Sequence, residues 1–220
     1  MLDRNGSVVL VDRAPFFPGG GGQLADQGVI VGRGGEVPFA GMRTDERGTW
    51  LEIGDMDPGA SVLMRVDPAF RALMCELHTV AHLVNALVFQ EFGGALLTGA
   101  QLSADGTLRV DCDLPGADND RLRALEGPLN EVIRQDLPVG YAWMPRAEAE
   151  ATPGMFRSKS VAPPPLEDGT VRIVSIGDLD RQACGGTHLR STGEARQARI
   201  VKIENKGRHN RRVRVAMEPA

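Results

Sequence analysis

Two pairs of possible metal ligands are the most informative residues of this sequence. His78 and His82 lie in an apolar stretch with helical periodicity, whereas Cys184 and His188 bound the turn Cys-Gly-Gly-Thr-His. A spacing of four puts two side chains on one face of a helix, and the glycines let the turn bend tightly. Three imidazoles and one thiolate are a donor set that suits Zn2+. The spacing predicts a shared zinc site, with scattered structural histidines as the alternative.

The chemistry of such a site depends on how many zinc ligands the protein supplies. Four protein ligands make a closed, structural site, whereas an open position lets zinc polarise a carbonyl or ionise water, and the sequence leaves both open. Thr79 follows His78 where a zinc protease has its general-base glutamate. The glycine tract with Gly20, Gly21 and Gly22 lacks the Lys-Ser/Thr of a phosphate-binding loop. No nucleotide cofactor is therefore expected.

The composition is that of an ordinary globular protein. The 220 residues are 42% hydrophobic and 25% charged, and only 5% are aromatic, so we expect a mainly aliphatic core. We find no apolar stretch of the ~18 residues that a membrane span needs, and no signal peptide. Three widely spaced cysteines do not make a disulfide framework, and Cys75 and Cys112 are expected to be small buried residues. These features predict a cytoplasmic protein without a membrane partner.

Charge is distributed unevenly along the chain. The net charge is −4, but the segment from Arg196 onward carries eight basic and two acidic residues, so it is +6 while residues 1–195 are −10. A basic segment of this kind could contact phosphates. It could equally be a solvated pair of strands.

Hydrophobic periodicity divides the chain near Asp67. Residues 1–66 contain short apolar runs separated by Gly, Asp and Pro, which predicts a small domain resembling a β-barrel. Asp67 and Pro68 are typical of a helix start, and helical spacing continues to about Phe92, just before two glycines.

Residues 67–220 combine helices and strands. The Ala-Asp-Gly-Thr segment at 104–107 predicts a hairpin turn, and residues 118–137 predict a second helix. Further strands are expected at 171–176, 198–203 and 211–215. The predicted fold class is α+β: a small N-terminal β-barrel-like domain (1–66) and an α+β domain (67–220) with helices packed on an antiparallel sheet.

Four motifs occur in a fixed order and cover nearly the whole chain. His78-Thr-Val-Ala-His82-Leu resembles an HTAxHLL motif, and Cys184-Gly-Gly-Thr-His188 resembles a CGGTH motif. Residues 16–23, Phe-Phe-Pro-Gly-Gly-Gly-Gly-Gln, resemble FYPxGGGQ, and residues 206–212 resemble KGKxNRR. All four are motifs of the alanyl-tRNA synthetase editing domain. Without an aminoacylation core, the chain is similar to the free-standing AlaX editing proteins of the two-domain type.

The resemblance implies an activity and a set of site residues. The implied activity is hydrolysis of the ester between tRNA(Ala) and a wrong amino acid, most often serine and in some members glycine. The implied Zn2+ ligands are His78, His82, Cys184 and His188. Gln23 and Thr98 match the editing pocket and are expected to act in catalysis, with a plain strand threonine as the alternative for Thr98. The residues expected to contact substrate or tRNA are Gly20, Gly21, Gly22, Lys206, Arg208, Arg211 and Arg212.

A second site is needed because serine and alanine are hard to separate by size alone. Such a site must recognise the serine hydroxyl, which alanine lacks. Gln23 or Thr98 could bond that hydroxyl, and no Asp or Glu stands out as a general base. Zinc could orient the aminoacyl group or activate water.

The chain departs from the family pattern at two places. Only six residues precede Ser7, where the family usually has another strand, so the barrel is incomplete or its first strand lies upstream. Ala25 stands where a glycine is usual, which reduces the freedom of the loop.

The main alternative function is a non-catalytic zinc-stapled tRNA-binding module. The other is a zinc hydrolase of small esters or peptides, for which no general base is visible.

Overall fold

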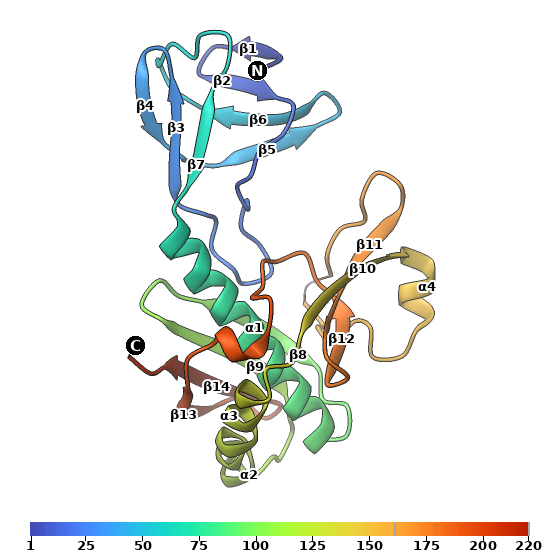
Figure 1. Cartoon of the computed structure of the whole chain (residues 1–220). Coiled ribbons are helices and arrows are strands. Elements are labelled where there is room, and N and C mark those ends of the chain that lie inside the picture. The colour runs from blue at the N-terminus through green and yellow to red at the C-terminus, as the bar shows by residue number, and fades with distance from the viewer. Residues whose placement is uncertain (161, 220) are drawn as a thin grey trace. The chain divides into compact units, whose positions relative to one another are not determined.

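The computed structural model describes residues 1–160 and 162–219 and divides the chain into two compact units. The smaller unit contains residues 1–20 and 24–72, and the larger contains 21–23 and 73–220. The described strands form four sheets, all with antiparallel pairing, and helices are few (Figure 1). The predicted α+β class is therefore confirmed.

The smaller unit is made of short strands. They are β1 (Asp3–Asn5), β2 (Val8–Val11), β3 (Gly28–Gly32), β4 (Gly35–Pro38), β5 (Met42–Asp45), β6 (Gly48–Glu52) and β7 (Leu63–Val66). One sheet has the order β1-β2-β6-β5 and the other β4-β3-β7. Val9, Ile30 and Leu51 lie in their shared apolar core. The pairings among the described residues do not close these strands into one barrel, so the predicted barrel is not confirmed.

Two features of this unit differ from the sequence prediction for physical reasons. The six residues before Ser7 do hold a strand, β1, which pairs with β2. Strands β4 and β5 were not predicted, because most of their side chains are exposed and leave little apolar alternation to detect.

The long helix α1 (Pro68–Glu91) carries both histidines of the first pair. Asp67 Oδ1 accepts hydrogen bonds from the N–H groups of Ala69 and Phe70 at 2.9 and 3.0 Å, which caps the helix. Gly93, with a φ of 62°, follows its end. Contrary to the sequence prediction, α1 is long and apolar enough to cross a membrane, but 72% of its most apolar window is buried inside the structure. It is a core helix of this fold.

The larger unit contains a four-stranded sheet with the order β13-β14-β9-β8. Its strands are β8 (Leu97–Leu102), β9 (Thr107–Asp113), β13 (Ala198–Lys206) and β14 (Asn210–Met217). Strands β8 and β9 form the predicted hairpin. Asn130 bonds to the backbone of Ala198, and Glu126 to that of Ile200, so their helix packs on β13 as predicted.

The single helix predicted over residues 118–137 is wrong. The structure has two helices, α2 (Asn119–Ala124) and α3 (Glu126–Arg134), separated at Leu125. Pro128 explains the break, because it lacks an N–H and its ring clashes with the carbonyl four residues earlier, that of Ala124.

A three-stranded sheet completes the larger unit, with β10 (Val139–Pro145), β11 (Thr170–Ile176) and β12 (Asp180–Ala183) in that order. Only β11 was predicted. Ala149 of the short helix α4 (Arg146–Ala151) and Met155 cover one face of this sheet, where they pack on Val171 and Ile173. Strand β12 leads directly into the CGGTH turn, and a short 3-10 helix (Thr192–Glu194) follows it.

Candidate metal centre

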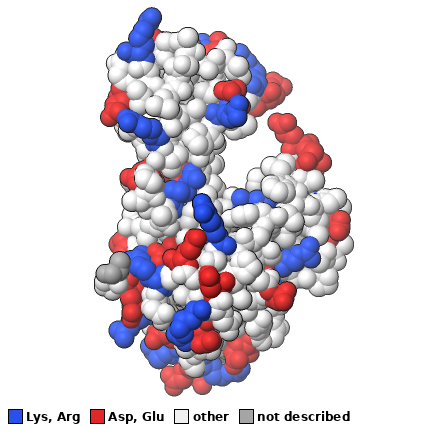
Figure 2. Space-filling view, viewed as in Figure 1, with Lys and Arg blue, Asp and Glu red and all other residues white. Residues whose placement is uncertain are grey.

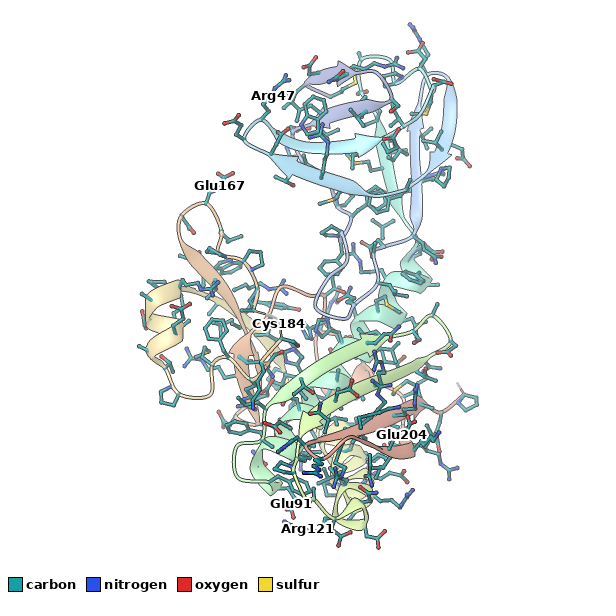
Figure 3. The ribbon with its side chains drawn as sticks, turned by 180° about the vertical axis from the view of Figure 1, so that it is seen from behind. Arg47, Glu91, Arg121, Glu167, Cys184 and Glu204 are labelled. Atoms are coloured by element: carbon teal, nitrogen blue, oxygen red, sulfur yellow. The ribbon has the colours of Figure 1, made fainter. Side chains whose placement is uncertain are left out.

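The side chains of His78, His82, Cys184 and His188 converge at one buried point of the larger unit. Helix α1 supplies the first two, and the turn after β12 supplies the others; Figure 3 marks Cys184 beside α1. All four are buried, and their ligand atoms lie within 4.8 Å of one another. The structure thus brings together the four residues that the sequence singled out, and this group could hold a metal ion.

Gln23 fixes the tautomer of His78 and ties it to the turn. Gln23 Oε1 accepts a hydrogen bond from the N–H of Thr187 at 3.0 Å and lies 2.7 Å from His78 Nδ1, while Gln23 Nε2 donates to Thr187 Oγ1 at 2.8 Å. The backbone N–H of Thr187 can only donate, so the Gln23 side-chain atom that it contacts must be the oxygen, Oε1. Because this oxygen can only accept, His78 must donate to it from Nδ1. His78 Nε2 is left facing Cys184 Sγ, 3.5 Å away.

The glycine tract holds Gln23 against the edge of β8. Gly22 has a φ of 91°, and its carbonyl accepts a hydrogen bond from a β8 amide at 2.8 Å. A Cβ at this position would lie 2.7 Å from the carbonyl carbon of Ala100, so only glycine fits. Gly20 and Gly21 also have positive φ, with open space around them. Their expected contact with the substrate stays a prediction.

A buried carboxylate orients the second histidine of α1. Asp180 Oδ2 lies 2.9 Å from His82 Nδ1 and accepts from Gln182 Nε2 at 2.9 Å, while Asp180 Oδ1 lies 2.8 Å from Arg157 Nη1. The carboxylate side chain is fully buried, so its charge depends on these partners. Such a carboxylate–histidine pair holds the ring and makes its other nitrogen a stronger ligand. Sequence reasoning missed Asp180, because its strand is too short to show a period.

Thr79 orients the third ring. Its Oγ1 lies 3.3 Å from His188 Nδ1 and accepts from the N–H of Leu189 at 3.1 Å. All three rings are therefore held through Nδ1, which leaves each Nε2 for a common ion. The place of Thr79 directly after His78 excludes the zinc-protease motif, but nothing in the sequence predicts its contact with His188.

Two of the donor–donor distances match those around a tetrahedral zinc ion. With Zn–S about 2.3 Å and Zn–N about 2.05 Å, tetrahedral coordination puts sulfur and nitrogen about 3.6 Å apart. Cys184 Sγ lies 3.5 Å from His78 Nε2 and 3.4 Å from His188 Nε2. One thiolate and three imidazoles are also the donor chemistry that zinc takes readily. The residues present therefore fit this metal.

Burial and mutual charge set the protonation of the cluster. Burial opposes ionisation of the Cys184 thiol. The pKa of this thiol is nevertheless lowered well below its ordinary value, by the charges of His78 and His82 and by a hydrogen bond with His188. Burial lowers the pKa of His188 to about 3. Burial opposes charge on His82 too, yet the Cys184 thiolate and Asp180 raise its pKa to about 10. The cluster thus offers a thiolate and a proton that a bound cation would displace.

Thr98, the other expected pocket residue, lies in β8. Its single hydroxyl hydrogen can go either to the carbonyl of Asp111, at 3.3 Å, or to Asn210 Oδ1, at 3.2 Å. Among the described residues neither partner belongs to the His/Cys cluster. Its role in the pocket stays a prediction.

Strand β13 and its neighbour β14 carry the basic segment, and much of its charge is paired. Glu204 Oε2 accepts from Arg214 at 2.8 Å, and Lys202 and Lys206 each lie 3.5 Å from Glu204 Oε1. The hydrogen bond from Arg214, with the charges of both lysines, lowers the pKa of Glu204 to about 2.

The remaining residues expected to bind tRNA lie in different surroundings. Arg212 donates to both oxygens of Asp111 at 2.6 and 2.8 Å. Arg211 is buried, and Arg208 is exposed in the turn between β13 and β14. Figure 2 shows acidic and basic side chains interspersed on the face in view. The structure therefore leaves Lys206 and Arg208 exposed, but not Arg211.

Comparison with known proteins gives the class of domain first. The family described as threonyl and alanyl tRNA synthetase second additional domain matches residues 171–214. This segment includes β11, β12 and the CGGTH turn with Cys184 and His188. The matched segment of the larger unit is therefore similar to the additional domain of these synthetases.

Free-standing relatives match over most of their length. The alanyl-tRNA editing protein AlaX-M of Saccharolobus solfataricus is 32% identical over 219 residues, which cover 97% of this chain and 90% of that protein. AlaX-M of Methanosarcina acetivorans is 34% identical over 218 residues, covering 93% and 86%. An alanine–tRNA ligase of Halorubrum lacusprofundi is 33% identical over 205 residues, which cover 90% of this chain but 21% of the ligase. The chain belongs to the AlaX family of alanyl-tRNA editing proteins.

Proposed function

We propose that this chain is a trans-editing hydrolase that deacylates mischarged tRNA(Ala) in the cytoplasm, with Ser-tRNA(Ala) as the main substrate and Gly-tRNA(Ala) as a second. The observation that carries the proposal is the buried cluster of three imidazoles and one thiolate in a chain of the AlaX family. We assign residues 67–220 to the zinc-containing editing domain and residues 1–66 to an accessory β domain.

The proposal assigns His78, His82, Cys184 and His188 as ligands of a zinc ion. When bound, zinc supplies a positive charge that can orient or polarise the aminoacyl group. The protein's own contribution is to hold the rings rigidly, through hydrogen bonds to each Nδ1.

Gln23 is the residue that we assign to recognition of the serine hydroxyl. Its oxygen is engaged by His78 and Thr187, but its amide nitrogen has two hydrogens and gives only one to Thr187. The second N–H is available as a donor in a site that is almost fully buried. Alanine would leave this donor unpaired, which is a stronger basis for discrimination than size. Thr98 is the second candidate.

Asp180 is not assigned as a general base. Both of its oxygens are already engaged, by His82 and Gln182 on one side and by Arg157 on the other. A proton taken by this carboxylate would remove the acceptor that holds His82.

One observation favours the alternative of a non-catalytic tRNA-binding module. The chain itself offers four donors, and four protein ligands close a zinc site. Such a module would bind tRNA in a salt-dependent way without turnover. Steady hydrolysis of a mischarged tRNA excludes it.

The test compares variants on three substrates. We expect His82→Ala and Cys184→Ala to abolish hydrolysis of Ser-tRNA(Ala), while the wild type spares Ala-tRNA(Ala) and Ser-tRNA(Ser). Cys112→Ala is the matched control, because Cys112 is also buried but lies outside the cluster. Full activity of the two cluster variants would contradict the proposal.

A further inference from the structure

Two large aromatic side chains are exposed on the edge strand of the sheet that leads to the metal centre. Tyr141 is 46% exposed and Trp143 is 59% exposed, both in β10. The chain has a single tyrosine and two tryptophans, and the other tryptophan, Trp50, is buried. Exposure of these rings is therefore unusual within this protein.

The register of the sheet puts both rings on the face that carries the metal ligand. Tyr141 pairs with Val174, which pairs with Gln182, and Trp143 pairs with Arg172. Directly after the last residue of β12, the N–H of Cys184 donates to the carbonyl of Arg172 at 3.0 Å, so Cys184 continues this pairing opposite Arg172. Directly paired residues point to the same side of a sheet.

Both exposed rings and Cys184 therefore lie on one face of this sheet. Cys184 and Gln182 lie on the inner strand, and Tyr141 and Trp143 lie two strands away. Two strand spacings of about 4.8 Å put the backbone of Trp143 roughly 10 Å from that of Cys184. The opposite face of β10 is the one that packs with Met144 against the core under α4.

Arg172 lies on the middle strand of this face, between Trp143 and Cys184. Its guanidinium stands 5.1 Å from the centre of the Tyr141 ring, and it donates to the carbonyls of Cys184, at 2.9 Å, and Gly186. Among the described residues no carboxylate lies within ion-pair distance of Arg172. This face of the sheet thus combines two exposed aromatic rings with a cation that has no acidic partner among the described residues.

We propose that Tyr141, Trp143 and Arg172 form a platform for the single-stranded 3′ end of the tRNA, with successive bases stacked on the two rings. Aromatic and guanidinium planes are the usual supports of unpaired bases, and the cation complements the phosphates. The inference rests on the proposed function, because the ester to be cleaved is carried by the last nucleotide. The base and the ester are attached to the same ribose. If the ester lies at the cluster, the base therefore lies within roughly 10 Å of it, about two strand spacings.

The test uses an uncharged RNA minihelix ending in single-stranded CCA and the same minihelix without those three nucleotides. We expect wild-type protein to bind the CCA form more tightly, and Tyr141→Ala or Trp143→Ala to weaken that binding about tenfold, as loss of one stacked base does. Trp143→Phe should restore most of the affinity. Phe92→Ala is the matched control. The Phe92 ring also has an arginine over it, Arg121 at 4.9 Å, but it lies outside β10, ten residues after His82 in the sequence.

Kinetics separate the platform from the proposed function. On Ser-tRNA(Ala), both alanine variants should raise KM with little change in kcat and unchanged metal content. If the wild type hydrolyses this substrate and the variants keep its KM, the platform is wrong and the function stands. If nothing is hydrolysed but Trp143 still governs CCA binding, the platform stands on a binding module. Equal binding of both minihelices, or self-association that Trp143→Ala abolishes without affecting RNA, would overturn the platform.

Discussion

Gly186 is the position in the CGGTH turn where one added methyl group would reach the metal centre. A Cβ there would overlap Cε1 and Nδ1 of the His78 ring and lie 2.9 Å from Gln23 Oε1. The ring would have to move by roughly 1 Å, several times the ~0.2 Å that metal–ligand distances tolerate. Gly186→Ala should therefore cost the site its His78 ligand, with a further ~1–3 kcal/mol of stability lost to overpacking.

The neighbouring glycine supplies the control. A Cβ at Gly185 would lie 3.8 Å from Pro163 Cβ, an ordinary contact, so Gly185→Ala should behave like the wild type. The assay is zinc affinity by competition with a chromophoric chelator, together with circular dichroism to establish folding. For Gly186→Ala we expect a loss larger than the roughly 10- to 100-fold that removing an outer hydrogen-bond partner costs. Wild-type zinc affinity in folded Gly186→Ala would refute this close packing of Gly186 against the His78 ring.

Three further predictions follow from the same contacts. Asp180→Asn should lower zinc affinity by about 10- to 100-fold, because a neutral amide holds His82 less firmly than a carboxylate; unchanged affinity in a folded variant would contradict this. Glu204 has a pKa lowered to about 2, so its ion pairs stabilise the protein above its ordinary pKa near 4.5 and are lost as the pH falls through the folded value; the difference in urea midpoint between the wild type and Glu204→Gln should therefore shrink below about pH 4.5 and vanish near pH 2. Burial raises the pKa of Cys112 to about 12, so native protein should resist alkylation there at pH 8 and lose this resistance in urea; rapid native labelling at Cys112 would argue against the burial.

Helix α1 shows what the sequence could predict. Its start is marked by Asp67 and Pro68, its end by two glycines, and its buried stripe by apolar residues at helical spacing, so its bounds were found to within a residue. The break between α2 and α3 was missed because one internal proline, Pro128, outweighed the helical pattern around it.

The metal cluster was predictable for a different reason. His78 and His82 are four residues apart, so a helix puts them on one face. Cys184 and His188 bound one tight turn, so the members of each pair are close in space because they are close in sequence. The residues that orient the rings had no such signal. Asp180 comes from a four-residue strand, and its hydrogen bond to His82 depends on how the sheet meets α1.

The exposed platform and the basic segment illustrate the same limit. Trp143 and Arg172 are 29 positions apart in the sequence, and only strand pairing makes them neighbours. Charge counting suggested a basic face, but Arg214 and Arg212 each find an acidic partner, Glu204 and Asp111, in the folded sheet. Net charge along the chain therefore overestimates the charge that this surface offers to phosphates.

The most direct measurement is deacylation of Ser-tRNA(Ala) and Ala-tRNA(Ala) by purified protein, before and after removal of metal with a chelator. We predict that only the seryl form is hydrolysed, that the chelator stops the reaction, and that added Zn2+ restores it. Equal hydrolysis of both forms, or hydrolysis that persists in demonstrably metal-free protein, would contradict a metal-dependent editing function.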